Sequence, residues 1–336
     1  MKDHFTKDEN YMQYCMNLAM NGLGSVSPNP LVGSLIVYNN HVIGQGFHKK
    51  FGGPHAEIEA IQNVSSKYKH LIPKSTLYVN LEPCNHFGKT PPCTDAILSQ
   101  NISKVVFGCY DPNPQMSGKS IQILKERGIQ VEGPILEQKT QELNSAYIKN
   151  VKTQKPFVIV KFAQSGDFFM GKTSHRVKIS SETTDLLVHK WRSECDGILI
   201  GKNTALTDDP LLTNRFMPGK NPLRIILDRS DTLPMHLRIF NAEAPTLTFS
   251  DLHVDKSATW HEILQALYKQ NIAILMVEGG AEIINSLNNE GEWDEAKIIT
   301  SSTVFLNDGL KAPSLTGRLK DTLILGDDTI CYLGRN

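Results

Sequence analysis

The sequence predicts an α/β protein built from two domains, each with a sheet flanked by helices. The chain has 336 residues, which suffices for two domains of ordinary size. After an initial hairpin signal, strand-like apolar runs alternate with helical patterns, which favours a mixed sheet covered on both faces. A polar stretch at 150–156 ends in Pro and precedes a second series of strands. We therefore expect domains at 1–150 and 151–336.

Composition and charge narrow the class of protein. Hydrophobic residues make up 40% of the chain and charged residues 21%, as in a packed globular protein. The 35 Lys and Arg residues balance the 35 Asp and Glu residues, so there is no overall basic field for nucleic acid. We find no run of 18 apolar residues to span a membrane and no signal-peptide core at the start. Six cysteines without a pairing pattern suit a reducing compartment, so we expect a cytoplasmic protein.

The first domain is expected to begin with a helix and a hairpin. Thr-Lys-Asp-Glu at 6–9 is a capping box, and the apolar residues after it share one helical face until Asn21-Gly22 ends the helix. Two apolar runs, 31–38 and 41–47, are joined by Asn39-Asn40, which predicts a hairpin. Further along we expect strands at 76–81, 104–109 and 129–132, and helices from His55 onward and at 93–100, 120–127 and 138–147.

The second domain opens with a strand at 157–162. Its further strands are expected at 197–200, 223–227, 272–277 and 296–300. The chain shows no internal repeat and no low-complexity tract, so this half reads as a second α/β unit.

One stretch, 54–93, carries the residues on which the chemistry depends. It contains His55-Ala56-Glu57, then Glu82-Pro83-Cys84, then Cys93. One His and two Cys can hold a zinc ion and leave the fourth tetrahedral position open, as in a catalytic site. A water molecule in that position becomes a nucleophile near neutral pH. We therefore predict a catalytic zinc site with His55, Cys84 and Cys93 as ligands.

The spacing matches part of the zinc deaminase signature, in which a Glu two residues after the His moves protons. The second Cys lies nine positions after Cys84, where that signature has three. Glu57 is therefore the candidate general acid and base rather than one more surface acid. Residues two apart do not share a face of an ideal helix, so His55 and Glu57 meet only if the first turn is irregular. A structural zinc with His86 as fourth ligand is the alternative.

With Gly-Lys-Thr-Pro-Pro-Cys at 88–93, these motifs resemble the deaminase half of the bifunctional riboflavin-biosynthesis deaminase/reductase family. Pro-Asn-Pro-Leu-Val-Gly at 28–33 and Asp-Pro-Asn-Pro at 111–114 fit the same family. The resemblance implies a cytidine-deaminase-like three-layer α/β/α domain with one zinc ion. The substrate-binding residues that it implies are Asn29, His48, His86 and Lys89.

The second half resembles the reductase domain of that family, whose fold looks like dihydrofolate reductase and which uses NADPH. The family's opening Lys-x-Ala-x-Ser-x-Asp-Gly reads here at 161–168 with Phe168 in place of Gly, and a later Trp is replaced by Lys178. Phe168 requires a backbone that avoids positive φ, and Lys178 offers a cation to the 2′-phosphate of NADPH. The implied substrate-binding residues are Lys161, Arg176, Arg192, Leu212, Arg215 and Glu278. The implied cofactor-binding residues are Ala163, Lys178, Thr204, Asp208, Gly280, Ala281 and Glu282.

The resemblance implies a bifunctional enzyme acting on a small phosphorylated pyrimidine, without nucleic acid or membrane as partner, and forming a homo-oligomer. It would deaminate 2,5-diamino-6-(5-phosphoribosylamino)pyrimidinone by hydrolysis and reduce the ribosyl group of the product to ribityl with NADPH. A nucleic-acid base deaminase would share the zinc chemistry, but the zero net charge and the long Cys84–Cys93 loop oppose it. The second domain could instead be a binding or oligomerisation module without reductase activity, which only the changes at Phe168 and Lys178 favour.

Overall fold

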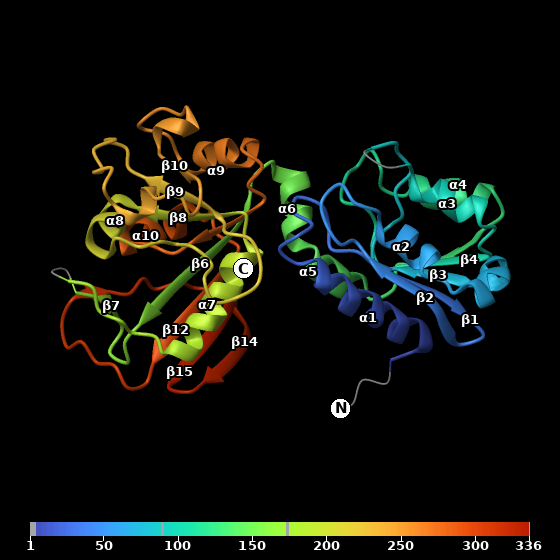
Figure 1. Cartoon of the computed structure of the whole chain (residues 1–336), viewed down its shortest axis with the longest axis horizontal. Helices are drawn as coiled ribbons and strands as arrows, with labels where there is room; N and C mark the ends of the chain where they lie inside the picture. Colours follow the sequence, from blue (N-terminus) through green and yellow to red (C-terminus); the bar gives the residue numbers. More distant parts are fainter. Residues whose placement is uncertain (1–4, 89–90, 173–174, 336) are drawn as a thin grey trace. The chain divides into compact units, whose positions relative to one another are not determined.

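The computed structural model describes residues 5–88, 91–172 and 175–335, so the predicted contact Lys89 lies outside the described residues. The chain folds into two compact units that divide after Thr153 (Figure 1). The boundary predicted at 150 falls inside a helix, α6 (Ser145–Thr153), which extends the first unit to Thr153.

The first unit contains a five-stranded mixed sheet, as the sequence predicts. The strand order is β2-β1-β3-β4-β5, with β1 antiparallel to both neighbours and β3, β4 and β5 parallel. The strands are β1 (Gly33–Tyr38), β2 (His41–Phe47), β3 (Thr76–Val79), β4 (Lys104–Phe107) and β5 (Gln130–Glu132). The helices are α1 (Lys7–Ala19), α2 (Ala56–Gln62), α3 (Cys93–Ser99), α4 (Lys119–Glu126), α5 (Glu137–Leu143) and α6, with 3-10 turns at Met20–Gly22 and Ser66–Lys74.

Helices cover both faces of this sheet, which gives the predicted three layers. Alternate residues of a strand point to opposite faces. Leu35 of β1 packs with Met12 of α1 in one apolar cluster, and Ile36 packs with Ala60 of α2 in the other. Helices α3 and α4 join the second cluster, on the same side of the sheet as α2 (Figure 1).

The first helix and hairpin form for the reasons that the sequence gives. Thr6 and Glu9 make the capping box at the start of α1. Asn39 and Asn40 both have positive φ, 43° and 70°, which a tight two-residue hairpin turn requires.

The single helix predicted at 138–147 is wrong, because α5 and α6 are separated at Asn144. The side chain of Asn144 accepts a hydrogen bond from the amide of Leu31 at 2.8 Å and donates to the Leu31 carbonyl at 3.0 Å. This pair of bonds to a distant loop fixes Asn144 outside both helices.

The second unit is built on an eight-stranded sheet of order β10-β9-β8-β11-β6-β12-β15-β14. The six strands from β10 to β12 run parallel, and β15 and β14 add an antiparallel hairpin at one edge. The strands of this sheet are β6 (Phe157–Gln164), β8 (Gly197–Gly201), β9 (Leu223–Leu227), β10 (Thr246–Leu247), β11 (Ile274–Val277), β12 (Glu295–Ser301), β14 (Arg318–Leu325) and β15 (Asp328–Gly334). A separate small pair joins β7 (Phe169–Gly171) and β13 (Leu310–Lys311).

Helices again lie on both faces of this sheet. They are α7 (Glu182–Glu194), α8 (Lys202–Asp208), α9 (Trp260–Lys269) and α10 (Ala281–Glu290), with 3-10 turns at Arg238–Phe240 and Ser250–Leu252. The main apolar cluster takes Leu264 of α9, Ile284 of α10 and Ala296 of β12. The neighbouring residue of β12, Lys297, points to the other face and lies 4.7 Å from the Trp191 ring of α7. Helix α7 therefore covers the face opposite α9 and α10.

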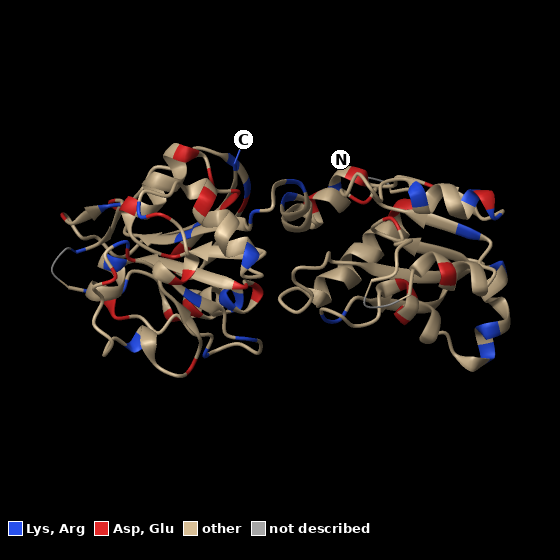
Figure 2. Ribbon diagram, turned by 90° about the horizontal axis from the view of Figure 1, so that it is seen from above, with Lys and Arg blue, Asp and Glu red and all other residues tan. Residues whose placement is uncertain are grey.

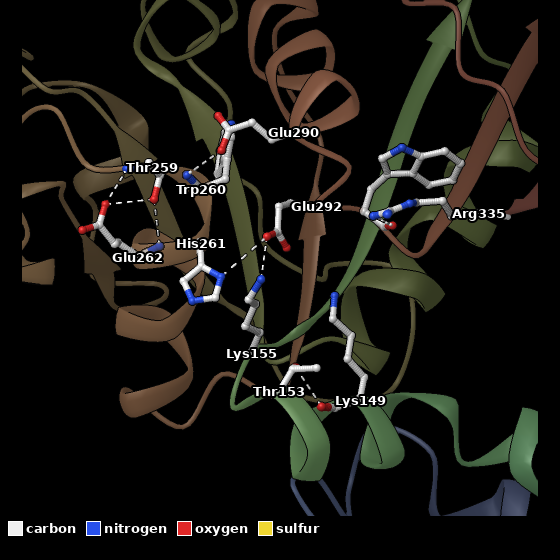
Figure 3. A network of polar contacts seen from close by, with 11 residues as sticks. Lys149, Thr153, Lys155, Thr259, Trp260, His261, Glu262, Glu290, Glu292 and Arg335 are labelled. Atoms are coloured by element: carbon white, nitrogen blue, oxygen red, sulfur yellow. Dashed lines mark hydrogen bonds and ion pairs between the residues drawn. The ribbon is translucent and has the colours of Figure 1, made fainter.

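A polar network ties the first residues of the second unit to the end of α10. Lys155 donates to the Glu292 carboxylate at 2.5 Å, and the Nδ1 atom of His261 lies 3.9 Å from the same carboxylate (Figure 3). Thr259 and Glu262 form a capping box at the start of α9 beside them.

Positive and negative residues are interspersed over both units (Figure 2). Such a surface gives neither unit a field of a single sign. Among the described residues, none of the helices has the length and apolar character needed to cross a membrane.

Candidate functional site

Three predicted metal ligands converge in the first unit. His55 is the N-cap of α2, Cys93 is the first residue of α3, and Cys84 lies in the loop after β3. The His55 Nδ1 atom lies 3.2 Å from the Cys93 sulfur and 3.4 Å from the Cys84 sulfur. All three ligand atoms lie within 4.8 Å of one another, as a tetrahedral zinc ion requires. In the described part of the chain this set does not include His86, which is exposed, so the structural-zinc alternative gains no support.

The electrostatics of the cluster favour metal binding. The hydrogen bond from Cys93 lowers the pKa of Cys84 to about 4 against the opposing effect of burial, and His55 lowers it further. Cys84 is therefore a thiolate, which is the form that binds metal. The neighbouring thiolate raises the pKa of Cys93 and, through its hydrogen bond, that of His55. The donor set of one imidazole nitrogen and two cysteine sulfurs fits zinc.

Glu57 lies beside this cluster without being one of its ligands. Its side chain is 3% exposed, and burial raises its pKa to about 7, with the Cys84 thiolate adding to the shift. A hydrogen bond with the Cys93 side chain lowers the pKa of Glu57 and so offsets part of this rise. His55 has extended rather than helical backbone angles, φ −75° and ψ 162°. The irregularity that the sequence requires is therefore at His55, which precedes the helix as its N-cap. Its extended backbone lets His55 and Glu57 face the same site.

Two of the residues that the resemblance assigns to substrate binding adjoin the metal cluster. His48 Nδ1 bonds to the carbonyl of Pro54 at 2.9 Å, so this nitrogen carries the proton. Its Nε2 atom then accepts from the side chain of Asn29 at 3.0 Å. The rings of His48 and His55 lie 5.6 Å apart. Asn29 is therefore held by a buried histidine whose ring contacts one of the predicted metal ligands.

Two buried asparagines that the sequence analysis missed hold the loop that carries Asn29. The side chain of Asn80 accepts from the amide of Gly33 at 2.7 Å and donates to the Leu31 carbonyl at 2.9 Å. Asn144 bonds to both backbone groups of Leu31. Asn80 is a polar residue within the apolar run 76–81, and this could have indicated its role. A buried amide side chain needs hydrogen-bond partners.

In the second unit, a buried carboxylate joins three elements. Glu278 follows β11 and accepts two hydrogen bonds from Arg192 of α7, both at 2.8 Å. The amine of Lys161, on β6, lies 3.8 Å from the same carboxylate. Burial alone would raise the pKa of Glu278, but the charges of Arg192 and Lys161 outweigh it and lower the pKa to about 2. The three predicted substrate-binding residues thus form one ionised cluster.

A second cationic group adjoins this cluster. Arg215 donates to the hydroxyl of Thr213 at 3.0 Å, and its backbone amide donates to Nδ1 of His189 at 2.9 Å. Burial lowers the pKa of Arg215, and the positive charges of Arg192 and Arg176 lower it further. Arg215 is thus exposed to the positive charges of two other predicted arginines, an arrangement suited to an anion. His189 escaped the sequence analysis because no motif marks it.

Four of the predicted cofactor residues lie near the starts of two helices: Thr204 in α8, and Gly280, Ala281 and Glu282 at the start of α10. A Cβ atom on Gly279 would lie only 3.0 Å from the methyl carbon of Thr204. The turn at Gly279 therefore packs closely against α8. Gly280 has φ 70° and is the N-cap of α10, whose first residues are Ala281 and Glu282. Such a glycine turn before a helix exposes backbone N–H groups to an anion. Of the other predicted cofactor residues, Ala163 lies on β6 and Asp208 ends α8. Leu212, a predicted substrate-binding residue, lies in the loop after α8.

Comparisons with known proteins agree with this division. Residues 5–109 match the model of the cytidine and deoxycytidylate deaminase zinc-binding region, and residues 156–320 match that of the RibD C-terminal domain. The riboflavin biosynthesis protein RibD of Aquifex aeolicus is 35% identical, with 98% of each chain covered. The chain belongs to the RibD family. It is therefore an enzyme of riboflavin biosynthesis with a zinc-dependent deaminase domain and an NADP-dependent reductase domain.

Relatives of known structure in the RibD family share the whole fold. A diaminohydroxyphosphoribosylaminopyrimidine deaminase/5-amino-6-(5-phosphoribosylamino)uracil reductase of Thermotoga maritima is 32% identical, with a TM-score of 0.89 over 98% of this chain and 99% of that one. One crystal form of Acinetobacter baumannii RibD is 30% identical with a TM-score of 0.88, over 98% of this chain and 99% of that one. The predicted α/β class and the order of the two domains are confirmed.

Where this chain departs from the RibD family motif, one expectation is wrong. Phe168 has φ 65°, so the backbone keeps the left-handed conformation that a glycine would favour. The loop imposes this conformation: the Phe168 amide donates to the Ser165 carbonyl at 3.0 Å, and its carbonyl accepts from Ala312 at 2.9 Å. The ring itself is largely exposed. Lys178, the other departure, pairs with Asp185 of α7 at 3.0 Å.

Proposed function

We propose that the chain deaminates a phosphoribosylaminopyrimidine and then reduces the ribosyl group of the product with NADPH. The observation that carries the first activity is the buried Glu57, which lies beside His55, Cys84 and Cys93 without belonging to that ligand set. The substrate class comes from the Thermotoga maritima relative, whose name states both reactions. The proposed substrate is 2,5-diamino-6-(5-phosphoribosylamino)pyrimidinone, and the product carries ribityl in place of ribosyl.

In the deaminase domain, the chain holds the metal and moves the proton. Zinc bound by His55, Cys84 and Cys93 would supply the Lewis acidity that activates water for attack on the amino-bearing ring carbon. Glu57 takes the proton of that water at its carboxylate and delivers it to the departing amino group, which leaves as ammonia. A carboxylate with pKa about 7 is suited to both directions of transfer at neutral pH.

The remaining predicted residues of this domain would bind the substrate. Asn29, oriented by His48, offers its amide to the pyrimidine. His86 is exposed on the loop between the two cysteine ligands, and with Lys89 it would face the phosphate. A cation and an imidazole on one loop suit a phosphate group.

In the reductase domain, the chain contributes orientation and charge. NADPH would supply the hydride. Arg192, Arg215 and Arg176 provide the positive field for the sugar phosphate, and Glu278 holds Arg192 in place through its two hydrogen bonds. Lys161 would contact the ribosyl group beside Glu278. The glycine turn at Gly280 and the adjoining Thr204 would face the dinucleotide phosphates.

We further propose that the enzyme acts in the cytoplasm as a homo-oligomer. Unpaired cysteines agree with a reducing compartment, since all six are free in the structure. Light scattering on the purified chain measures the oligomeric state directly.

A coupled assay tests the two activities on the purified full-length chain. With the diamino substrate alone, the enzyme should release ammonia. NADPH should be oxidised when this substrate is also present and should remain unchanged when the enzyme receives NADPH alone. The Glu57→Gln variant should fail on the diamino substrate but still oxidise NADPH when it receives the deaminated intermediate. No NADPH oxidation with that intermediate in the wild type would favour the binding-module alternative.

A further inference from the structure

Glu82 is a buried acid near the zinc site that none of the roles above uses. It lies two residues before the ligand Cys84, in the loop after β3, and its side chain is 5% exposed. A buried carboxylate is costly unless its oxygens are fully hydrogen-bonded. The partners of Glu82 therefore indicate what it is for.

Among the described residues, the donors to the Glu82 carboxylate all come from one segment, Asp111–Ser120, which runs from the loop after β4 into the first turn of α4. One carboxylate oxygen accepts from the amide of Asp111 at 3.1 Å and from that of Gly118 at 2.9 Å. The other accepts from the amide and the hydroxyl of Ser120, at 3.3 and 2.6 Å. The backbone amide of Glu82 adds a bond to the carbonyl of Cys109 at 2.8 Å. One residue thus attaches both ends of the segment to the strand that leads to Cys84.

This segment, which we call the 111–120 loop, follows β4, and the loop that carries Cys84 follows the adjacent parallel strand β3, so both loops leave the same edge of the sheet. Burial raises the pKa of Asp111, the charges of Glu82 and Cys84 raise it further, and that of His86 lowers it, in keeping with this placement. The loop has its own internal turn, in which Asp111 accepts from Asn113 at 2.8 Å. The loop is thus folded by its own hydrogen bonds and attached to β3 by the Glu82 carboxylate. We expect it to shift as a unit when that carboxylate is replaced.

We propose that Glu82 is a positioning residue for deamination, which sets the 111–120 loop as a wall of the substrate site. The inference rests on the proposed deaminase function. The four groups that face the carboxylate are all donors, so only an acceptor on both oxygens satisfies them. Gln has the same size but turns an NH₂ group toward backbone N–H groups. Glu82→Gln therefore removes some of the hydrogen bonds that hold the loop, while the side-chain volume stays almost the same.

A purely structural role is the competing explanation, because Glu82 also caps α4. The N-cap of α4, Gly118, has no side chain, and the carboxylate accepts from the Gly118 and Ser120 amides in its place. A cap alone would affect stability and leave substrate affinity unchanged. The two explanations thus differ in KM.

The test compares variants of the full-length, zinc-loaded enzyme in the deaminase assay. Glu82→Gln should raise KM for the diamino substrate by roughly 10- to 100-fold, because it leaves buried donors of the loop unsatisfied. The kcat should change by less than about threefold, zinc content should stay at that of wild type, and reduction of the deaminated intermediate should be unaffected. Glu82→Asp, which keeps two acceptor oxygens, should recover part of the loss.

Two further variants keep the test decisive. Ser120→Ala removes only the 2.6 Å bond and should raise KM in the same direction by a smaller factor, so it decides the matter if Glu82→Gln does not fold. Leu124→Ala weakens the packing of α4 and leaves Glu82 intact. An equal rise in KM in Leu124→Ala, or an unchanged KM in Ser120→Ala, would overturn the proposal. Absence of deamination in the wild type would instead refute the proposed function.

Discussion

At the scale of single residues, the metal ligands and Glu57 have separable tasks. In the proposed site Cys84 contributes a thiolate to the metal, so Cys84→Ser should lose both zinc and deamination. Glu57 is buried beside the ligands but is not one of them. Glu57→Gln should therefore keep zinc and lose turnover by roughly 10² to 10⁴, the usual contribution of a general acid and base. Zinc content by elemental analysis and the rate of ammonia release measure the two effects.

The matched control for this pair is Glu59→Gln, two residues further along α2. Glu59 pairs with Lys49 at 2.5 Å, away from the ligands, and its loss should leave zinc and turnover near wild type. Wild-type turnover in Glu57→Gln would refute the proton-transfer role.

Phe168 gives a prediction about stability at the same scale. An L-residue with φ 65° costs about 1 to 2 kcal/mol relative to glycine, and an exposed ring recovers little of it by burial. The greater chain entropy of an unfolded glycine offsets part of the gain. Phe168→Gly should therefore raise the free energy of unfolding of the reductase domain by about 1 kcal/mol, as measured by chemical denaturation.

Phe305 supplies the control for that substitution. It is another exposed Phe, and it is not among the positive-φ positions of the described residues. Phe305→Gly should lower stability, because it adds unfolded-state entropy without relieving strain. A stabilisation of equal size in both variants would mean that the strain argument is wrong.

Site residues could be predicted from the sequence where a motif fixes their chemistry. His55, Glu57, Cys84 and Cys93 are defined by ligand type and spacing, and the structure brings them together. The residues that hold them, such as Glu82, carry no such spacing. Their partners are backbone groups of distant segments, which only the fold brings within reach.

At the scale of elements, prediction succeeded where a local signal specifies the structure. The hairpin of β1 and β2 follows from two asparagines that accept positive φ. Strands β14 and β15 were missed, because β14 is an edge strand exposed on both faces and so shows no clean alternation of apolar residues. The break between α5 and α6 was missed because Leu31, more than a hundred residues away in sequence, causes it.

The ion cluster that joins β11, α7 and β6 predicts a pH dependence. The folded pKa of Glu278, about 2, lies below its ordinary value of 4.5. Its contribution to stability is therefore fully present above about pH 4.5 and is lost as the pH falls toward 2. At neutral pH the wild type should exceed Glu278→Gln in unfolding free energy by roughly 3 kcal/mol, and the difference should shrink with acidification.

Denaturation of both proteins at a series of pH values measures that difference. Glu182→Gln, which removes an exposed carboxylate from the start of α7, is the control and should differ little from wild type at any pH. A gap between wild type and Glu278→Gln that stays constant down to about pH 3 would show that the carboxylate is not the stabilising group.

At the scale of the whole molecule, each unit has its own core. The main cluster of the second unit draws on residues from Val158 onward, and the two clusters of the first unit end at Leu136. Units with separate cores are expected to fold alone. The fragment 1–153 should fold and bind zinc, and the fragment 154–336 should fold and bind NADPH.

The exact start of the second fragment should matter. A fragment that begins at Phe157 lacks Lys155, and with it the charged hydrogen bond of 2.5 Å to Glu292. It should be less stable than 154–336 by about 1.5 to 3 kcal/mol, the range for hydrogen bonds to charged groups. Lys155→Met in the longer fragment removes the same bond while keeping the chain length, so it should reproduce most of the loss. If 154–336 showed no cooperative unfolding transition, the second unit would depend on the first for its stability. Equal stability of the two fragments would instead show that Lys155 is dispensable and that the β6 strand alone anchors the start of the unit.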